Sequence, residues 1–448
     1  MSKDSSDSLA VDGAQTQESG AEQRTRGISR RGMLALMGVA GLGAGTAIGV
    51  PTGMGISSAR SKSSGDNPEL EYSFFGEHQS GITTPAQDQM HFAAFDLVDD
   101  MTRDDLIELL QDWSYASNRM MMGLQVSASG AFEGSPLMPP DDTGEAADLG
   151  AYGLTITFGF GRSLFQKEDG TDRFGLSDAL PKEFTDLPPM INDFIDEQTS
   201  GGDIAIQACA NDPQVAVHAI RNLTRMAFGR AVIRWSQLGF GRTSSTSAAQ
   251  STPRNLFGQK DGTNNIKAEE TDYLDEHVWI SSSQGPNWAM GGSFLVARRI
   301  NMTLEIWDGV QLEEQERVTG RAKKEGAPLS GTKEFDEPDF HAKDATSGNL
   351  KIDERSHVFR TNPENNNGIR MLRRGYNFVD GNDDLGRLNA GLFFIAFVKD
   401  PARFAEVHKN MSQDDMFSEY LKTTASSVFI VPPGVGDEHG YVGQSLLE

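Results

Sequence analysis

The chain has 448 residues, of which 37% are hydrophobic and 23% are charged, and its formal net charge at pH 7 is −24. Such a negative field repels phosphate backbones and anionic membrane surfaces, so we expect no nucleic acid among its partners. The single cysteine, Cys209, rules out an intrachain disulfide and any cage of cysteine ligands around zinc or an iron–sulfur cluster. We expect its thiol to be buried and inert.

The segment at residues 1–54 predicts export by the twin-arginine route. Arg30 and Arg31 precede a stretch rich in Gly and Ala that ends near Val50. A membrane-spanning helix needs about 20 strongly apolar residues, and this stretch is only weakly hydrophobic, so chance arginines before an anchoring helix are the less favoured interpretation. Proteins on this route usually leave the cytoplasm folded, often around a cofactor. We therefore expect a cofactor, and a location in the periplasm, the cell envelope or the extracellular medium.

Residues 55–69 are rich in Ser and Gly and predict a linker, after which the globular part begins near Leu70. The run 154–160 is typical of a strand, whereas 101–112 and 212–229 have apolar residues at helical spacing. Strands that alternate with helices in this way predict a mixed α and β fold.

A polar span at 235–255 separates two halves that each contain strand and helix patterns. We place a domain boundary there, which gives an N-terminal domain at 70–251 and a C-terminal domain at 252–448. The elements expected in the second half are buried strands at 293–300 and 391–398 and a solvated helix at 311–320.

Three clusters in the second half carry residue types that do chemistry, and each alone has a simpler explanation. The stretch 257–265 surrounds Asp261 with glycines, but an Asp-Gly pair is among the commonest turn signals. His357 stands between strand-forming residues and precedes Arg373, although such a histidine is more often structural than a ligand. Glu419 precedes a strand-like run, where a lone glutamate is usually solvated.

Taken together and in this order, the clusters resemble the dye-decolorizing peroxidases, and within them the exported deferrochelatase/peroxidase branch. The specific core of the resemblance is the G-x-x-D-G turn at 258–262, the Ser-His pair that ends at His357, and Leu-Arg-Arg-Gly-Tyr at 372–376. Weaker similarity extends from 78–82 to 431–434. The twin-arginine signal fits the same branch.

The resemblance implies a b-type haem, one per chain, with His357 as the axial ligand of the iron. It makes Asp261 and Arg373 the catalytic pair on the opposite, distal side of the haem, and Glu419 the hydrogen-bond partner of the proximal imidazole. Further residues expected along the haem are Gly262, Thr263, Asn264, Asn362, Pro363, Glu364 and Arg373.

These assignments agree with what peroxide chemistry requires. A carboxylate such as Asp261 can take a proton from one peroxide oxygen and return it to the other, provided that a nearby guanidinium keeps it ionised. Arg373 cannot lose its own proton and serves as a fixed positive charge. The chain departs from the family where Asn-Ile at 265–266 replaces the common Asn-Pro, and where Gly375 replaces an asparagine of some branches. The sequence therefore names only two polar distal groups.

The implied fold is α+β, with two ferredoxin-like domains, each an antiparallel sheet with helices, and haem in the C-terminal domain. The implied activity is reduction of hydrogen peroxide to water with oxidation of dyes, phenols or ferrous iron. Trp279, Trp288 and Tyr376 are candidates for an electron relay near the surface, although aromatic residues at strand positions are more often core.

Two alternatives remain open. The chain could be a haem-handling deferrochelatase that releases iron from haem for uptake, with an iron-uptake permease as a partner. It could also be an exported binding protein without a redox cofactor, in which case the three clusters would be structural coincidences. The family commonly forms homo-oligomers, and the sequence fixes no number of subunits.

Overall fold

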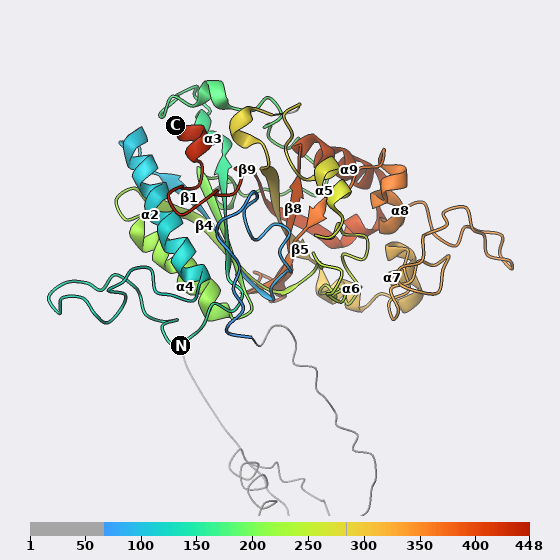
Figure 1. Ribbon diagram of the computed structural model, residues 1–448. Coiled ribbons are helices and arrows are strands. Elements are labelled where there is room, and N and C mark those ends of the chain that lie inside the picture. The colour runs from blue at the N-terminus through green and yellow to red at the C-terminus, as the bar shows by residue number, and fades with distance from the viewer. Residues whose placement is uncertain (1–66, 284) are drawn as a thin grey trace, which may run out of the picture. The chain divides into compact units, whose positions relative to one another are not determined.

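The structure is a computed structural model that describes residues 67–283 and 285–448 (Figure 1). These residues belong to one compact unit. The expected twin-arginine signal at 1–54, and the expected linker at 55–69 up to residue 66, lie outside the described residues. Within the described part, no helix is long and apolar enough to cross a membrane.

One antiparallel sheet of nine strands forms the centre of the molecule. The strands are β1 Gln89–Leu97, β2 Thr155–Gly161, β3 Ile204–Ala210, β4 Ala231–Arg242, β5 Ser293–Met302, β6 Leu372–Arg373, β7 Tyr376–Asn382, β8 Leu388–Val398 and β9 Leu421–Val431. Their order is β5-β9-β2-β3-β1-β4-β7-β8-β6, and β5 also pairs with β8. The sheet therefore closes on itself, with β6 and β7 pairing with successive parts of β8.

Helices and short 3₁₀ turns connect and cover the strands. The helices are α2 Arg103–Met121, α3 Arg162–Phe165, α4 Pro213–Met226, α5 Thr271–His277, α6 Leu304–Asp308, α7 Leu312–Thr319, α8 His357–Thr361, α9 Pro401–Asp414 and α10 Gln444–Leu447. The 3₁₀ turns are η2 Ser177–Ala179, η3 Glu197–Thr199, η4 Asn287–Ala289, η5 Pro363–Asn365 and η6 Met416–Tyr420.

The elements expected from the sequence are present, with bounds close to the expected ones except at the end of α2, which continues to Met121 where the sequence predicted an end at 112. Helix α2 begins after Thr102, whose side chain accepts from the backbone N–H of Asp105 while the Asp105 side chain bonds back to Thr102. Helix α4 begins after Asp212, which caps it in a similar way. These polar side chains satisfy N–H groups that the first turn of a helix leaves free, so the sequence marks both starting points.

The closed sheet encloses an aromatic core. Phe92 of β1 stacks on Trp235 of β4 at a centroid distance of 5.2 Å, and it contacts Phe393 of β8 at 5.3 Å and Phe429 of β9 at 6.1 Å. Cys209 of β3 is buried in the same core, as the sequence predicts. Because residues from both halves meet there, the closed sheet holds the two halves together.

The prediction of an α+β fold with antiparallel strands is confirmed, but the structure does not contain two separate sheets. Strand β2 pairs with β9 and β4 pairs with β7, so edges that each half would expose are joined. Free edges carry unpaired N–H and C=O groups, and closure of the sheet removes them.

The outer faces of the two halves are covered differently. Helix α4 lies over β1 and β3 with α2 beside it, whereas α9 lies at the other side of the molecule, next to β5 and β8, with α8 packed against it (Figure 1). Trp113 of α2 is fully buried and its indole N–H donates to the carbonyl of Leu223 at 2.8 Å. The helix and sheet interface of the first half is thus filled with side chains.

The three aromatic residues considered for a surface relay are buried. Tyr376 has no exposed surface, and Trp279 and Trp288 are only 8% and 9% exposed. Trp279 stacks on His78, with ring centroids 3.7 Å apart. The structure therefore places all three as core residues, which corrects the surface interpretation.

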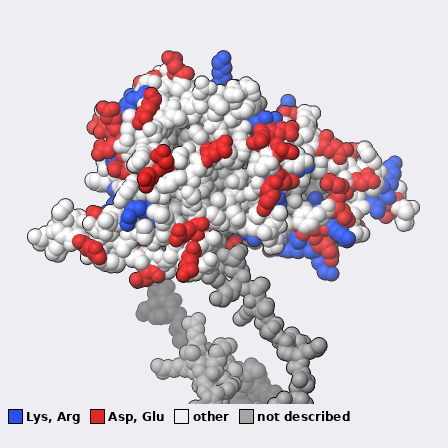
Figure 2. Space-filling model, in the orientation of Figure 1, with Lys and Arg blue, Asp and Glu red and all other residues white. Residues whose placement is uncertain are grey.

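Acidic side chains are spread over the face of the molecule drawn in Figure 2, with basic side chains between them. This distribution agrees with the formal net charge of −24.

Candidate functional site

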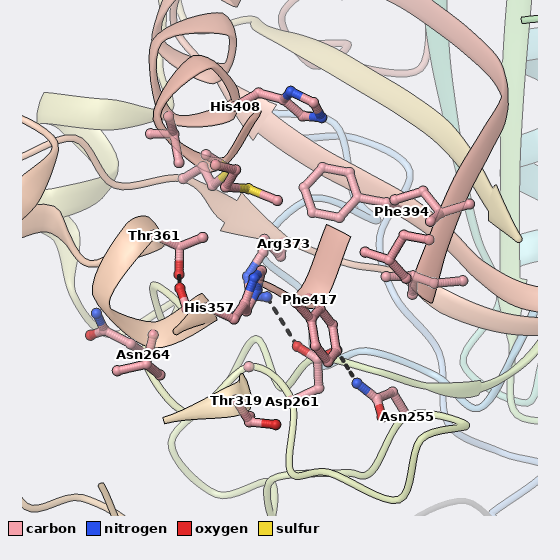
Figure 3. A pocket seen from close by; sticks show the side chains of 18 of the residues that line it. Asn255, Asp261, Asn264, Thr319, His357, Thr361, Arg373, Phe394, His408 and Phe417 are labelled. Atoms are coloured by element: carbon pink, nitrogen blue, oxygen red, sulfur yellow. Dashed lines mark hydrogen bonds and ion pairs between the residues drawn. The ribbon is translucent and has the colours of Figure 1, made fainter. Parts of the chain in front are cut away.

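A pocket lies mainly in the second half of the chain, between the strands β5, β8 and β9 and the helices α8 and α9, with Ile191 and Asn192 of the first half also at its wall (Figure 3). Most of its lining is apolar, with Met302, Leu392, Phe394, Val407 and Phe417 among the lining residues. The predicted site residues that line it are Asp261, Gly262, Thr263, Asn264, His357, Asn362, Pro363 and Arg373. Glu364 and Glu419 are exposed and do not line it.

A glycine-flanked turn presents Asp261 to the pocket. Gly258 and Gly262 have φ values of 76° and 83°, a left-handed conformation that side chains with a Cβ rarely adopt. A Cβ on Gly262 would also lie 3.0 Å from Cα of Ser244. The backbone N–H of Asp261 donates to the carbonyl of Pro253 at 3.0 Å, which closes the turn.

Asp261 and Arg373 form an ion pair at the pocket wall. Nη1 of Arg373 donates to Oδ1 of Asp261 at 3.0 Å, and the two side chains are 27% and 15% exposed. Nδ2 of Asn255 donates to the second oxygen, Oδ2, at 3.2 Å (Figure 3). Each carboxylate oxygen thus has its own donor, and Asn255 is a polar group beside Asp261 that the sequence analysis missed.

Asn265 fixes Arg373 relative to the turn. Its side-chain Oδ1 accepts from the backbone N–H of Arg373 at 2.7 Å, and its Nδ2 donates to the Arg373 carbonyl at 2.9 Å. The amide therefore bonds both backbone polar groups of one residue, as a neighbouring strand would. This contact places β6 beside a turn that lies more than a hundred residues earlier in the chain.

His357 begins helix α8, directly after Ser356, whose hydroxyl caps the helix. Nδ1 of His357 lies 2.8 Å from Oδ2 of Asp415, and the Asp415 side chain is fully buried. A carboxylate at Nδ1 favours the tautomer with its proton there, which leaves the lone pair of Nε2 free for a metal. No described residue is hydrogen-bonded to Nε2. The imidazole is therefore prepared as a ligand facing the pocket.

The partner of the imidazole is Asp415 rather than Glu419, and the expectation for Glu419 was wrong. Oδ1 of Asp415 accepts from the backbone N–H of Phe417 at 2.9 Å, and this bond starts the 3₁₀ turn η6. Within that turn Glu419 is turned outward and exposed. An aspartate that caps a turn is a weak sequence signal, because such caps are common.

Arg298 and His408 are among the other polar residues that line the pocket. Arg298 of β5 is buried and paired with Asp193, and burial lowers the pKa of its guanidinium. Burial also lowers the pKa of His408, on α9, to about 4, so its ring is neutral at neutral pH. His408 and Ser412 are hydrogen-bonded at 3.0 Å.

Family models match both halves of the chain. A model described as "Dyp-type peroxidase, N-terminal" matches residues 79–241, and one described as "Dyp-type peroxidase, C-terminal" matches residues 252–436. A curated relative, "Deferrochelatase" of Escherichia coli O157:H7, is 34% identical over 383 residues, which are 84% of this chain and 86% of that protein. The chain belongs to the Dyp-type peroxidase family.

Solved structures give the same result. Ferric DtpA from Streptomyces lividans and a DyP-type peroxidase from Streptomyces coelicolor are each 38% identical, with a TM-score of 0.76, and cover 85% of this chain and 98% of their own. A DyP-type peroxidase from Cellulomonas bogoriensis is 33% identical with a TM-score of 0.75, and covers 85% of this chain and 99% of its own. This Dyp-type peroxidase is a haem enzyme, an oxidoreductase that uses peroxide to oxidise reducing substrates.

The pocket fits such a cofactor. His357 offers one imidazole nitrogen with its lone pair free, which is the donor that a haem iron with four macrocycle nitrogens still requires. The apolar lining from β5, β8, α8 and α9 suits the faces of a flat, largely apolar ring. An iron macrocycle is therefore compatible with both the donor and the walls.

Proposed function

We propose that this Dyp-type peroxidase binds one b-type haem per chain in the pocket of its second half, with His357 as the axial ligand. The observation that carries the proposal is that the pocket is lined both by His357, with its free Nε2, and by the Asp261–Arg373 ion pair. Gly262, Thr263, Asn264, Asn362 and Pro363 line the pocket and would contact the haem there. Glu364 and Glu419, both exposed, have no part in this proposal.

Asp261 moves the proton. Haem supplies the iron at which the peroxide O–O bond breaks and to which the reducing substrate returns electrons. Asp261 accepts the proton from the peroxide oxygen that faces the iron and delivers it to the oxygen that leaves as water. The same carboxylate can do both because the proton that it accepts in the first step is the proton that it gives up in the second, with Arg373 beside it throughout.

Arg373 and Asp415 hold charge on the two sides of the pocket. The Arg373 guanidinium stabilises negative charge on peroxide while the proton is on Asp261. Asp415 accepts the Nδ1 proton of His357, which orients the ring and makes Nε2 a stronger donor to iron. Both roles depend on charges that the protein holds in place before peroxide enters.

Stopped-flow absorbance of the haem-loaded protein tests these roles. The wild type should change spectrum rapidly on mixing with hydrogen peroxide, and Asp261→Asn should slow this change by about 10²- to 10⁴-fold, the usual contribution of a proton-transferring group. Arg373→Leu should slow it as well, because a fixed cation is lost. Asp261→Asn at the wild-type rate would remove Asp261 from the mechanism.

Dyes, phenols and ferrous iron are the reducing substrates that we propose. A deferrochelatase activity is the second candidate, and it rests on the curated relatives named "Deferrochelatase" at 34% identity. Loss of haem iron with an intact porphyrin in the product would favour that activity, and an iron-uptake permease would then be a partner. Recovery of only intact haem, or of linear tetrapyrroles from a cleaved porphyrin ring, would argue against it.

We also propose that the chain folds as two ferredoxin-like domains, at 70–251 and 252–448. It is supported by the strand orders β4-β1-β3-β2 and β9-β5-β8-β7 and by the β-α-β-β-α-β succession of the first half. Export by the twin-arginine route and assembly into a homo-oligomer belong to the same proposal. Fusion of residues 1–54 to a reporter, and light scattering of the purified protein, test these two points.

A further inference from the structure

Asn255 occupies an unusual place beside the ion pair of the pocket. It lies on the turn that carries Asp261 and lines the pocket, and its Nδ2 donates to Oδ2 of Asp261 at 3.2 Å (Figure 3). Arg373 donates to the other oxygen, Oδ1, at 3.0 Å. The carboxylate is thus held at both oxygens by donors from two separate parts of the chain.

The turn fixes which way the Asn255 amide faces. Its Oδ1 accepts from the backbone N–H of Phe257 at 3.1 Å. Its backbone N–H donates to the carbonyl of Gln259 at 3.0 Å, and its carbonyl accepts from Gly258 at 2.9 Å. A flipped amide would set two acceptors together at Asp261 and two donors together at Phe257. Only one orientation satisfies all groups, and it directs the NH₂ to Asp261.

A second donor matters because a carboxylate rotates easily. The terminal torsion of an aspartate is broad, so one bond from Arg373 leaves the plane of the carboxylate free to turn about that contact. Proton transfer needs heavy atoms about 2.6–3.2 Å apart and aligned. A group that fixes the plane of the carboxylate therefore lowers the entropic cost of reaching the geometry for proton transfer.

We propose that Asn255 is a positioning residue, which holds Oδ2 of Asp261 and so fixes the plane of the proton-transferring carboxylate. This inference rests on the proposed function of Asp261. Asn255 acts through Asp261 and transfers no proton itself. Its loss slows the reaction with peroxide and leaves haem binding unchanged.

A double-mutant cycle tests this role. The second-order rate constant for hydrogen peroxide is measured by stopped flow for wild type, Asn255→Ala, Asp261→Ala and the double variant, all loaded with haem. Asn255→Ala should react about 10- to 100-fold more slowly than wild type, in keeping with the cost of a small misplacement. In the Asp261→Ala background the same substitution should have no further effect. Effects that multiply would show that Asn255 does not act through Asp261, and the proposal would be wrong.

The cycle separates the inference from the function on which it rests. A normal rate in Asp261→Ala would overturn the role of Asp261 itself. A slow Asp261→Ala with a wild-type rate in Asn255→Ala would keep that role and overturn only the role of Asn255. Asn255→Asp keeps the side-chain shape and the acceptor for Phe257 but replaces the donor with a second carboxylate beside Asp261, so it should be at least as slow as Asn255→Ala, and it guards against misfolding of the smaller variant.

Two measurements do not depend on turnover. Hydrogen cyanide gives up a proton when it binds haem iron as cyanide, so its association rate, read from the Soret band, should fall in Asn255→Ala as the peroxide rate does. Titration of haem into the haem-free variant should give the wild-type affinity. An unchanged cyanide rate would contradict the proposal, as would a large loss of haem affinity that explains the slow rate.

Asn222 provides a matched control. It is a buried asparagine of α4, whose Oδ1 accepts from the backbone N–H of Thr143 and whose Nδ2 donates to the Thr143 hydroxyl and the His218 carbonyl. Asn222→Ala removes the same kinds of bond far along the chain from Asp261. It should lower the melting temperature and leave the peroxide rate unchanged. A slow Asn222→Ala would mean that general destabilisation explains Asn255→Ala as well.

Discussion

In both halves of the sheet the strands lie in the same order when they are counted along the chain and the short strand β6 is left out: fourth, first, third, second. The two halves nevertheless use their outer faces differently. In the first half, β4-β1-β3-β2, helices α2 and α4 press large side chains onto the strands. Trp113 is fully buried there and lies 5.4 Å from Phe95 and 6.0 Å from Phe158, measured between ring centroids. In the second half, β9-β5-β8-β7, the corresponding face lines the pocket.

The difference lies in the helices and in the side chains that they carry. In the first half α2 has 19 residues and α4 has 14; in the second half α9 also has 14, but the α8 helix that carries His357 has only 5. Helix α9 contacts β5 and β8, α8 packs against α9, and Arg298 and Ile300 of β5 face a pocket instead of a packed interface. One topology therefore provides either a solid core or a binding site, depending on the placement and side chains of its covering helices.

The largest effect, a loss of haem, is expected when the pocket-lining imidazole of His357 is removed. His357→Ala removes the free nitrogen donor, so the reconstituted protein should lose its Soret band during gel filtration. The exposed His341 provides the control, because His341→Ala leaves the pocket untouched. Full haem retention by His357→Ala would mean that another residue binds the iron, and the second half would no longer differ from the first as the half that binds haem.

Truncation of a side chain should lower the free energy of unfolding more in the packed helix–sheet interface of the first half than at the pocket of the second half. Trp113→Ala removes a fully packed indole and should destabilise the haem-free protein by about 3–5 kcal/mol. Phe404→Ala should cost less, since Phe404 faces the pocket and already lacks contacts on that side. Urea unfolding monitored by circular dichroism measures both. Equal losses would mean that the second interface is packed as tightly as the first.

The proximal hydrogen bond gives a smaller effect on the cofactor. Asp415→Asn cannot accept the Nδ1 proton of His357 as a carboxylate does, so haem affinity should fall about 10- to 100-fold. Glu419→Gln, in the same turn, should bind haem as the wild type does, because Glu419 is exposed. Titration of haem into the haem-free proteins decides between the two residues, and the reverse ranking would restore Glu419 as the partner.

Buried histidines should make both halves sensitive to acid. Burial lowers the pKa of His91, on β1, to about 4, as it does for His408 in the pocket. The unfolded chain, with an ordinary histidine pKa of about 6.5, binds more protons between these values. This contribution to stability is therefore full above pH 6.5 and is lost as the pH falls to 4.

Removal of His91 should reduce that loss by a small amount. In His91→Leu the fall in unfolding free energy between pH 6.5 and 4 should be smaller by on the order of 1 kcal/mol after screening by solvent. His408→Leu offers the equivalent change in the second half. Urea unfolding at several pH values measures the slope, and a wild-type slope in His91→Leu would show that folding does not lower the pKa of His91.

By itself the sequence determined the residues whose meaning is local. Asp261 between Gly258 and Gly262 marks a turn that only glycines can make. That turn, followed along the chain by His357 and Arg373, was enough to identify the family from the sequence. Helices α2 and α4 were also predictable, since their caps and apolar spacing act within a few residues.

Only the tertiary structure decided which distant residues meet. The sequence favoured Glu419 beside the imidazole, but the packing of α8 against α9 and the 3₁₀ turn after Asp415 bring Asp415 there and turn Glu419 outward. Closure of the sheet and the contact of Asn255 with Asp261 were equally invisible, because strand edges and amides pair through space and leave no periodic trace in the sequence. Local backbone geometry is encoded residue by residue, whereas partners across the pocket depend on how whole elements pack.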